Sequence, residues 1–330
     1  MTTNTKLISI VIPVYNEEAN VDRAYAHVCN LFQPLSDRYG LEFVFTDNHS
    51  SDGTFQALQT IAARDPRVRV IRFSRNFGFQ KSILAGLKHA KGQAAVQLDC
   101  DLQDPPELIL KFLEHWEQGY AVVYGIRRSR PESWIVSLAR KAFYRLINAL
   151  SDDDLPLDAG DFRLLDRRVL DQLHEIHDAT PYLRGLIASL GFRQVGVPYD
   201  RGAREFGESK FGLWSLIRLG MDGLVNHSLL PLRIATFVGL ILSGVTIITI
   251  CIYAFGRMVL GHEWPAGFAT TTILILFSIT LNALFLGIIG AYLGRIYAQV
   301  KHKPLVIVER TLNLESEAET SEYLHSDSVT

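Results

Sequence analysis

Two aspartates one residue apart, Asp99 and Asp101, point most directly to chemistry, and Gln103 follows them in the run LDCDLQDPP. Carboxylate and amide oxygens are ligands that Mg²⁺ and Mn²⁺ accept, and substrate phosphates commonly complete the coordination of such ions. An Asp-x-Asp pair also occurs in solvated loops, and here a Pro-Pro helix start follows at 105–106. Because the pair follows an apolar run, we expect a Mg²⁺ or Mn²⁺ site that bridges a diphosphate.

The chain lacks the two common glycine-rich phosphate loops. No GxGxxG turn follows its first predicted strand, and the pattern GxxxxGK[ST] occurs nowhere in it. Neither the dinucleotide fingerprint nor the common phosphate loop is therefore available to hold a cofactor. The charge of a bound diphosphate would have to be neutralised by other groups.

Basic side chains stand at two places where they would meet phosphate. Arg127 and Arg128 follow a predicted strand and would bind phosphate oxygens in a bidentate manner, with a solvated charge run as the ordinary alternative. Arg201, Arg204 and Lys210 precede a helix predicted next to the membrane. They would meet either the phosphate of an acceptor or anionic lipid.

The elements that must position these residues alternate over the first part of the chain. Short apolar or β-branched runs predict strands at 7–14, 41–46, 68–73, 94–99 and 121–125. Amphipathic patterns predict helices between them at 17–32, 54–64, 79–90 and 106–118. This alternation predicts an α/β fold, Rossmann-like, with a mostly parallel sheet and crossover helices.

Polar residues cluster where the predicted strands end. Glu17 follows the first strand, Asp47 ends the second, Asp99 and Asp101 end the fourth, and Arg127 follows the fifth. Ligands of parallel sheets bind at the carboxyl ends of the strands. Four strand ends therefore predict one shared cleft.

Two long apolar segments near the C-terminus predict membrane helices. Residues 234–256 are 23 consecutive positions without Asp, Glu, Lys or Arg, and a second such stretch covers 264–294. At about 1.5 Å per residue, a helix of the first stretch would reach roughly 34 Å, enough to cross the hydrocarbon core. A pair of buried soluble helices is disfavoured because both segments are apolar on every face. We predict two transmembrane helices, at 232–256 and 268–292.

The charges that flank this pair predict its orientation. Arg257 is the only Lys or Arg in the connecting loop, 257–267, whereas five such residues flank the outer ends: Arg218, Arg233, Arg295, Lys301 and Lys303. Basic residues favour the cytosolic side, so the loop should be extracytoplasmic and both termini cytosolic. The start of the chain has no charged n-region of a signal peptide. We expect a multi-pass protein of the inner (plasma) membrane with a cytosolic catalytic domain.

The remaining segments complete the predicted organisation: a catalytic domain at 1–210, a juxtamembrane helix at 211–231 and a cytosolic tail at 293–330. Within the catalytic domain, 134–150 has an amphipathic pattern suited either to the lipid headgroup boundary or to packing on the sheet. The tail from Glu309 onward is rich in Glu, Ser and Thr without periodicity, which predicts disorder.

Composition excludes some other functions. A net charge of −2 does not indicate a nucleic-acid partner, and 48% hydrophobic with 21% charged residues is ordinary for a globular chain. The three cysteines have no paired spacing. Neither a disulfide framework nor a zinc site is therefore predicted.

Six segments, in order, carry a resemblance to a known family: VIPVYNEE (11–18), FTDNHSSDGT (45–54), SRNFGFQKSILAGLKHAKG (74–92), LDCDLQDPPEL (98–108), YGIRRSR (124–130) and AGDFRLLDRR (159–168). Together with the two apolar segments, they resemble the polyprenyl-phosphate glycosyltransferases of glycosyltransferase family 2. That group includes the dolichol-phosphate mannose synthases and the bacterial enzymes that load glucose or related sugars onto undecaprenyl phosphate.

The resemblance implies a GT-A fold and a role for each matching residue. It implies that Asp161 is the active-site carboxylate near the acceptor and that Asp99, Asp101 and Gln103 hold the divalent metal. It places a nucleotide-binding set around the nucleobase and ribose: Pro13, Tyr15, Glu17 and Asp47. It also implies a homo-oligomer, with a tetramer as the form found in related bacterial enzymes.

The function expected from these residues is a membrane glycosyltransferase. It would transfer a sugar from a nucleotide sugar, with UDP-glucose as the first candidate, to polyprenyl phosphate. The phosphate monoester is ionised above pH ~6 and would attack the anomeric carbon directly, with inversion. Asp161 would then either orient the acceptor or stabilise the oxocarbenium-like centre. The donors UDP-galactose, UDP-GlcNAc, GDP-mannose and a formylated aminoarabinose nucleotide stay open.

Other functions share part of this pattern. A family 2 transferase acting on another membrane lipid or glycan is one, and a processive polysaccharide synthase is another, although its QxxRW motif is absent. A catalytically silent membrane-tethered scaffold would not need Asp99, Asp101 and Asp161. A sugar nucleotidyltransferase would share the nucleotide-binding sheet but would have no use for two membrane helices.

Overall fold

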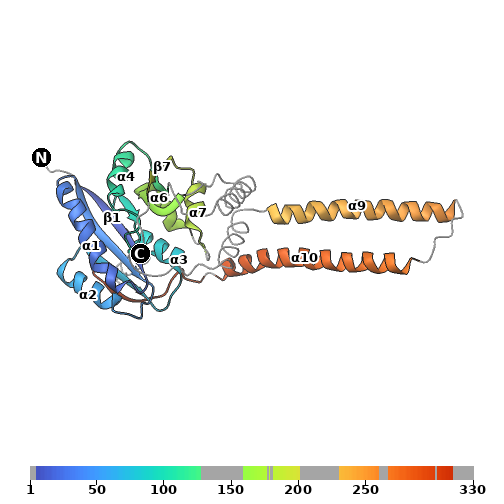
Figure 1. Cartoon of the computed structure of the whole chain (residues 1–330), viewed down its shortest axis with the longest axis horizontal. Helices are drawn as coiled ribbons and strands as arrows, with labels where there is room; N and C mark the ends of the chain where they lie inside the picture. The colour runs from blue at the N-terminus through green and yellow to red at the C-terminus, as the bar shows by residue number, and fades with distance from the viewer. Residues whose placement is uncertain are drawn as a thin grey trace, which may run out of the picture. The chain divides into compact units, whose positions relative to one another are not determined.

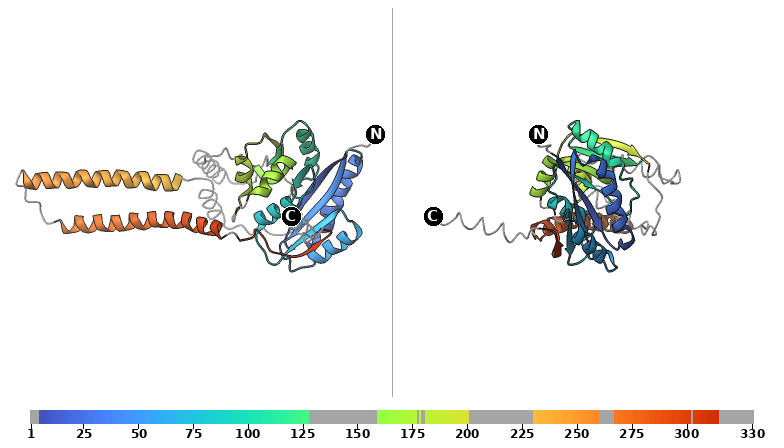
Figure 2. Two further views of the ribbon diagram at one scale, coloured as in Figure 1. Left: turned by 180° about the vertical axis from the view of Figure 1, so that it is seen from behind. Right: turned by 90° about the vertical axis from the view of Figure 1, so that its left-hand side faces the viewer.

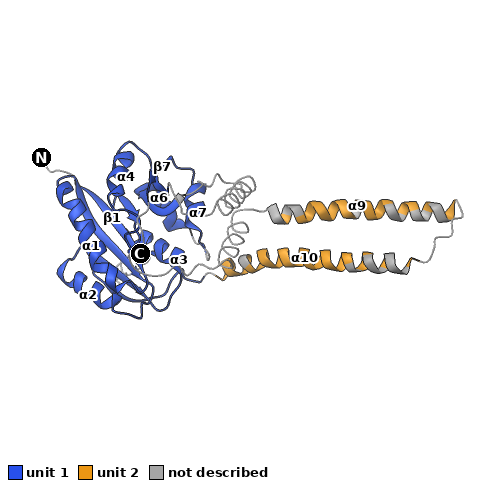
Figure 3. Ribbon diagram, viewed as in Figure 1, with its two compact units in different colours: residues 1–138, 155–209, 303–330 blue, residues 139–154, 210–302 orange. Residues whose placement is uncertain are grey.

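The computed structural model describes residues 5–127, 159–176, 178, 181–200, 230–259, 267–301 and 303–314. The chain forms two compact units (Figure 3). Unit 1 contains residues 1–138, 155–209 and 303–330, and unit 2 contains residues 139–154 and 210–302.

Unit 1 is built on an eight-stranded sheet with the order β7-β5-β6-β4-β1-β2-β3-β8. Its strands are β1 (Lys6–Val14), β2 (Tyr39–Asp47), β3 (Val68–Phe73), β4 (Ala94–Gln97), β5 (Val122–Arg127), β6 (Ala159–Asp166), β7 (Gln194–Tyr199) and β8 (Val308–Leu312). β6 and β8 are antiparallel to their neighbours, and the other pairings are parallel. The predicted α/β class with a mostly parallel sheet is confirmed.

Helices cover both faces of this sheet (Figures 1 and 2). One face is covered by α1 (Glu18–Phe32), α2 (Thr54–Arg64) and α4 (Leu108–Glu117). The other face is covered by α3 (Phe79–His89), α6 (Arg167–Glu175) and α7 (Leu183–Ser189). A short 3₁₀ turn, η1 (Gln33–Leu35), follows α1.

The central strands are buried on both faces, which explains their continuous apolar sequences. In β1, Ile8, Ile10 and Ile12 point into the core under α1, α2 and α4, whereas Val11 points into the core under α3. Strands covered by helices on both sides bury successive side chains in opposite cores. The apolar runs that predicted these strands therefore mark the middle of the sheet.

Residues 309–314 are ordered where disorder was predicted from Glu309 onward, so the prediction was wrong for these residues, while residues 315–330 lie outside those that the structure describes. Residues 308–312 form β8, which pairs antiparallel with β3. Asn313 then donates from its side-chain amide to the carbonyls of Ala62 and Val68 at 2.8 and 2.9 Å. Without β8, the edge of β3 would present unpaired backbone N–H and C=O groups, and the tail hydrogen-bonds to them. The composition of the tail carries no information about this pairing.

Unit 2 contains two long helices, α9 (Leu230–Met258) and α10 (Phe268–Val300). In the part of the chain that the structure describes, one stretch, Phe277–Val300, is long and apolar enough to cross a membrane. The apolar stretch in α9, Ala235–Ile248, is shorter, so the predicted pair of transmembrane helices is not confirmed. α10 also continues beyond residue 292, where the tail was predicted to begin.

Two further predictions concern residues outside those that the structure describes. They are the interfacial helix at 134–150 and most of the juxtamembrane helix at 211–231.

Candidate active site

The strand ends of unit 1 bring the predicted site residues to one edge of the sheet. β1, β2 and β4 are parallel and finish at this edge, at Val14, Asp47 and Gln97. β6 runs in the opposite direction, and its Arg163 lies opposite Gln97. Because β6 therefore starts at this edge, Asp161 is placed beside the loop that follows β4.

Asp161 is held by a bidentate ion pair. Arg184, at the start of α7, donates from Nε to Oδ1 at 2.9 Å and from Nη2 to Oδ2 at 2.8 Å. Gln80, at the start of α3, also hydrogen-bonds this carboxylate and accepts the backbone N–H of Leu183 at 3.2 Å. Two helices from different parts of the sequence thus fix one carboxylate, and Asp161 keeps 15% of its side-chain surface exposed.

The charges around Asp161 keep it ionised. Burial favours the neutral acid, but the hydrogen bonds and charge of Arg184 outweigh burial and hold the pKa of Asp161 below its usual value. The buried Arg163 adds a second positive charge, and its guanidinium donates to the carbonyl of Gly160 at 2.9 Å. Burial lowers the pKa of Arg163 to about 10, which leaves it protonated at neutral pH.

The loop after β4 presents the Asp-x-Asp pair in a fixed turn. Gln97 donates from Nε2 to Asp99 Oδ1 at 2.9 Å, and Asp101 Oδ1 accepts the backbone N–H of Gln103 at 3.1 Å. Leu102 between them has a φ of 53°, in the left-handed region. Asp99 and Asp101 stay partly exposed, whereas the side chain of Gln103 is buried.

Glu17, on the loop after β1, acts electrostatically on the same buried thiol, Cys100, as the two carboxylates of this loop. Burial, followed by the negative charges of Glu17, Asp101 and Asp99, raises the pKa of the Cys100 thiol between them. Among the described residues, no group of three His, Cys, Asp or Glu side chains is arranged to hold a metal ion alone. The donor set nevertheless fits Mg²⁺ or Mn²⁺, which one or two carboxylates bind together with substrate phosphates.

The four residues expected around the nucleotide differ in their exposure to solvent. Tyr15 is 48% exposed and Glu17 is half-buried, whereas Pro13 is buried within β1. Asp47 is fully buried, and its Oδ1 accepts the backbone N–H of Ser50 at 2.9 Å. Arg72 Nη1 donates to its Oδ2 at 3.1 Å. In this structure Asp47 therefore shapes the loop after β2 from beneath.

Arg127 is partly engaged by a buried cluster at the ends of β5 and β7. Its Nη2 donates to Asp104 Oδ2 at 3.2 Å, and its Nε donates to the hydroxyl of Tyr199 at 3.1 Å. Tyr199 in turn donates to Asp104 Oδ1 at 2.6 Å. Two nitrogens of the guanidinium are thus occupied. The other four basic residues expected at phosphate lie outside the described residues: Arg128, Arg201, Arg204 and Lys210.

Comparison with protein families matches residues 9–174 to the family described as Glycosyl transferase family 2. The matched region spans β1 to α6 and contains Asp99, Asp101 and Asp161. This chain belongs to glycosyl transferase family 2. It is therefore a glycosyltransferase, as the sequence motifs predicted.

Curated relatives resemble this family 2 chain along almost its whole length. An uncharacterized glycosyltransferase of Bacillus subtilis, YkcC, is 39% identical over 309 residues, covering 93% of this chain and 95% of the relative. The SfII prophage-derived bactoprenol glucosyl transferase of Shigella flexneri is 34% identical over 307 residues, covering 92% and 98%. A prophage bactoprenol glucosyl transferase homolog of Escherichia coli is 33% identical over 306 residues, covering 92% and 98%.

A solved structure also resembles the chain. It is the mannosyltransferase PcManGT from Pyrobaculum calidifontis in complex with GDP-Man and Mn²⁺. The TM-score is 0.49 at 20% identity, over 91% of this chain and 88% of that one.

Several residues of this family 2 site were not predicted from the sequence. Arg184, Arg163 and Gln80 surround Asp161, and Tyr199 and Asp104 engage Arg127. Gln80, Asp104 and Arg163 lie within segments that carry the family resemblance, so those segments already contained a signal for them. Arg184 and Tyr199 lie on later elements and have no motif spacing to the residues they contact.

Proposed function

We propose that this chain transfers a sugar from a nucleotide sugar to polyprenyl phosphate at the cytosolic face of a membrane. The observation that carries this proposal is the set of Asp99, Asp101 and the ion-paired Asp161 at one sheet edge of a family 2 chain. Relatives named bactoprenol glucosyl transferases match it along 92% of its length, beyond the catalytic unit. Their names support a lipid acceptor and glucose as the transferred sugar, and we propose UDP-glucose as the first donor to test.

The state of Asp161 supports a direct attack by the acceptor. A carboxylate whose pKa is held low by Arg184 is a weak base, so it is poorly suited to removing a proton. A phosphate monoester needs no such help because its second ionisation lies near pH ~6. We assign Asp161 an orienting and electrostatic role toward the anomeric centre, which is attacked with inversion.

The donor diphosphate would be bound at the loop after β4. Asp99, Asp101 and Gln103 would hold a Mg²⁺ or Mn²⁺ ion, which when bound supplies positive charge to the departing nucleoside diphosphate. The accessible Tyr15 and Glu17 would bind the nucleoside, and the buried Pro13 and Asp47 would support the site. We propose further phosphate contacts from the third guanidinium nitrogen of Arg127 and from four other basic residues: Arg128, Arg201, Arg204 and Lys210.

We further propose that α9 and α10 cross the membrane as a pair. α9 has 29 residues and α10 has 33, and both carry large exposed apolar side chains such as Phe237, Ile248, Leu274 and Leu286. Apolar surface of this extent requires lipid or protein cover. The loop 257–267 would then be extracytoplasmic and unit 1 cytosolic, on the inner (plasma) membrane.

Product analysis tests the proposed reaction class. The full chain in detergent is incubated with UDP-glucose, polyprenyl phosphate and Mn²⁺, and the released phosphorus compounds are separated by chromatography. We expect acceptor-dependent UDP that disappears in excess EDTA. Formation of UTP and glucose 1-phosphate when pyrophosphate replaces the lipid would indicate a nucleotidyltransferase, and no UDP release from UDP-glucose together with no release from the other candidate donors would indicate a scaffold, so either result contradicts the proposal.

A further inference from the structure

The strand that follows α10 carries a bulge beside the expected nucleotide site. In the pairing of β8 with β3, Val308 lies opposite Phe73 and Arg310 lies opposite Arg72. Glu309 is therefore an extra residue without a partner of its own. A β-bulge of this kind re-aims a side chain and is common next to active sites.

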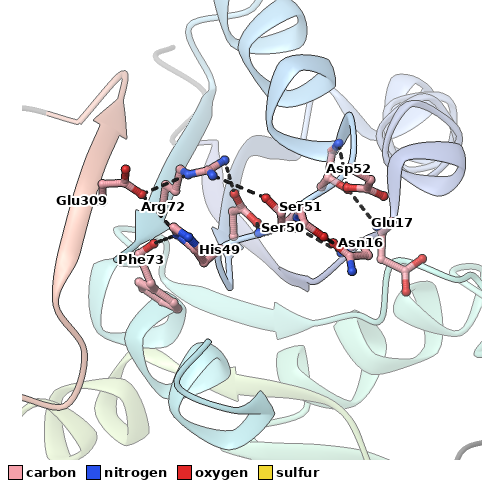
Figure 4. A network of polar contacts seen from close by, with 11 residues as sticks. Asn16, Glu17, His49, Ser50, Ser51, Asp52, Arg72, Phe73 and Glu309 are labelled. Atoms are coloured by element: carbon pink, nitrogen blue, oxygen red, sulfur yellow. Dashed lines mark hydrogen bonds and ion pairs between the residues drawn. The ribbon is translucent and has the colours of Figure 1, made fainter. Parts of the chain in front are cut away.

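The bulge directs the Glu309 carboxylate onto Arg72, near the end of β3, and onto His49, on the loop after β2 (Figure 4). Its Oε2 lies 3.2 Å from Arg72 Nε and 3.3 Å from His49 Nδ1. His49 Nδ1 also lies 3.1 Å from the carbonyl oxygen of Phe73. A residue from the end of the chain thereby reaches the loop after β2.

Arg72 connects Glu309 with the buried Asp47. Besides its bond to Asp47, its Nη2 donates to the carbonyl of Ser50 at 3.4 Å. Its guanidinium carbon lies 4.4 Å from the centre of the Phe55 ring, a distance typical of a cation–π contact. Four separate groups thus fix the orientation of one half-buried guanidinium.

The same loop is tied to the residues that follow β1. The backbone N–H of Asn16 donates to Ser50 Oγ at 3.0 Å, and the backbone N–H of Ser51 donates to Asn16 Oδ1 at 2.8 Å (Figure 4). Asn16 lies between Tyr15 and Glu17, the two accessible residues of the expected nucleotide site. A continuous set of contacts therefore leads from Glu309 to that site.

We propose that Glu309 is a positioning residue for the donor nucleotide. It acts through Arg72, which holds Asp47 and the loop at 48–54 in the form that accepts the nucleoside. The inference rests on the proposed function, because the nucleotide site is itself proposed there. Glu309 is 45% exposed, and exposed ion pairs add little to stability, so its effect should appear in binding.

Nucleotide binding by the full chain in detergent tests the role of Glu309. UDP and GDP are each titrated into the protein with Mn²⁺ by calorimetry, and thermal unfolding is recorded in parallel. We expect Glu309→Gln to raise the Kd of the preferred nucleotide about 3- to 10-fold, with nearly unchanged Tm. The matched control is Glu114→Gln, which removes an exposed carboxylate from α4 and should leave the Kd as in the wild type.

A double variant tests whether the effect passes through Arg72. In an Arg72→Met background, Glu309→Gln should cause no further change in Kd, because the residue it positions has been removed. The inference would be overturned, and the proposed function left standing, by either of two results. One is an equal Kd in wild type and Glu309→Gln, and the other is an equal increase in Kd from Glu309→Gln in the wild-type and Arg72→Met backgrounds. If the wild type bound neither UDP nor GDP, the proposed function would fail, and the inference with it.

Discussion

Asp161 and Arg184 form a bidentate ion pair at the edge of the sheet, and the role of that carboxylate in catalysis can be measured. Asp161→Asn keeps the shape of the side chain but removes its charge. We expect kcat to fall about 10²-fold or more with little change in donor KM, because the lost interaction acts mainly in the transition state. Steady-state kinetics with a saturating lipid acceptor would measure both values.

The control for this variant is Asp171→Asn. Asp171 is an exposed carboxylate on α6 that pairs with Arg167, and its replacement should leave kcat unchanged. A near-normal kcat in Asp161→Asn would show that Asp161 is not the active-site carboxylate.

The ion pair also makes a prediction about pH. The folded-state pKa of Asp161 lies below its usual value, so the pair stabilises the fold above the unfolded-state pKa of about 3.9. That contribution is lost as pH falls through the folded-state pKa. Because this low pKa keeps Asp161 ionised throughout the assayed pH range, the pH dependence of kcat in wild type should follow ionisation of the acceptor phosphate, near pH ~6.

Arg184→Met should change this profile. Without Arg184, only Arg163 and Gln80 would oppose the effect of burial among the main influences on Asp161, so its pKa should rise and kcat should fall at a higher pH than in wild type. The profile would be measured from pH 5 to 8 at about equal intervals. Arg64→Met, which removes an exposed arginine paired with Asp22, serves as the control, and identical profiles in all three proteins would contradict the assignment.

The Asp-x-Asp loop makes a separate prediction about metal. Asp101→Ala should abolish turnover and the EDTA-sensitive part of nucleotide-sugar affinity, because the variant loses an oxygen ligand. Asp101 is partly exposed, so its loss should leave Tm nearly unchanged. Full wild-type activity in excess chelator would show that the reaction does not need a metal ion.

The sequence predicted the acidic residues of this site better than their partners. Asp99 and Asp101 stand at a strand end in a recognisable spacing, and Asp161 lies in a segment with family resemblance. Arg184 lies on α7, 23 positions after Asp161 in the sequence, so only tertiary packing brings the two side chains together. The burial of Asp47 likewise depends on Arg72 from another strand.

At the scale of elements, α3 packs so closely on the sheet that one position must be glycine. A Cβ on Gly86 would collide with Val11 Cγ1 and lie 3.3 Å from Thr46 Cγ2. Gly86→Ala should therefore destabilise unit 1 by about 1–2 kcal/mol, the strain outweighing the better helix propensity of alanine. Denaturant unfolding would measure this loss.

A compensating variant checks that explanation. Val11→Ala removes the methyl group that the new side chain meets, so the double variant should lose less stability than the two single losses added together. Strict additivity would contradict a steric cause.

Most elements of unit 1 were predictable, and the exceptions have physical causes. α2 and β3 match their predicted bounds because local patterns define their ends. β6 and β7 were not assigned from the sequence, and β8 was predicted to be disordered. Each of these strands pairs with residues far away in the chain, and short-range periodicity carries no information about such pairing.

At the scale of the whole molecule, the proposed pair of membrane helices predicts a topology. Reporter fusions after residue 330 should report the cytosol, and fusions near Gly261 should report the opposite side. The reverse pattern would contradict the orientation. Two fusions on the same side would instead show that α10 does not cross, in spite of its long apolar stretch, Phe277–Val300, and would contradict the proposed pair. The homotetramer implied by the resemblance stays a prediction.

Identification of the lipid product would show directly whether this chain glycosylates undecaprenyl phosphate. The purified full chain would be incubated with undecaprenyl phosphate, Mn²⁺ and, in separate reactions, each of the five candidate nucleotide sugars, and the lipid extract would be examined by mass spectrometry. We predict one new species whose mass equals undecaprenyl phosphate plus one sugar residue, formed with UDP-glucose first among the donors and formed far more slowly with Asp161→Asn. Unmodified undecaprenyl phosphate with every donor, from a protein that still binds nucleotide, would contradict the claim that this lipid is the acceptor.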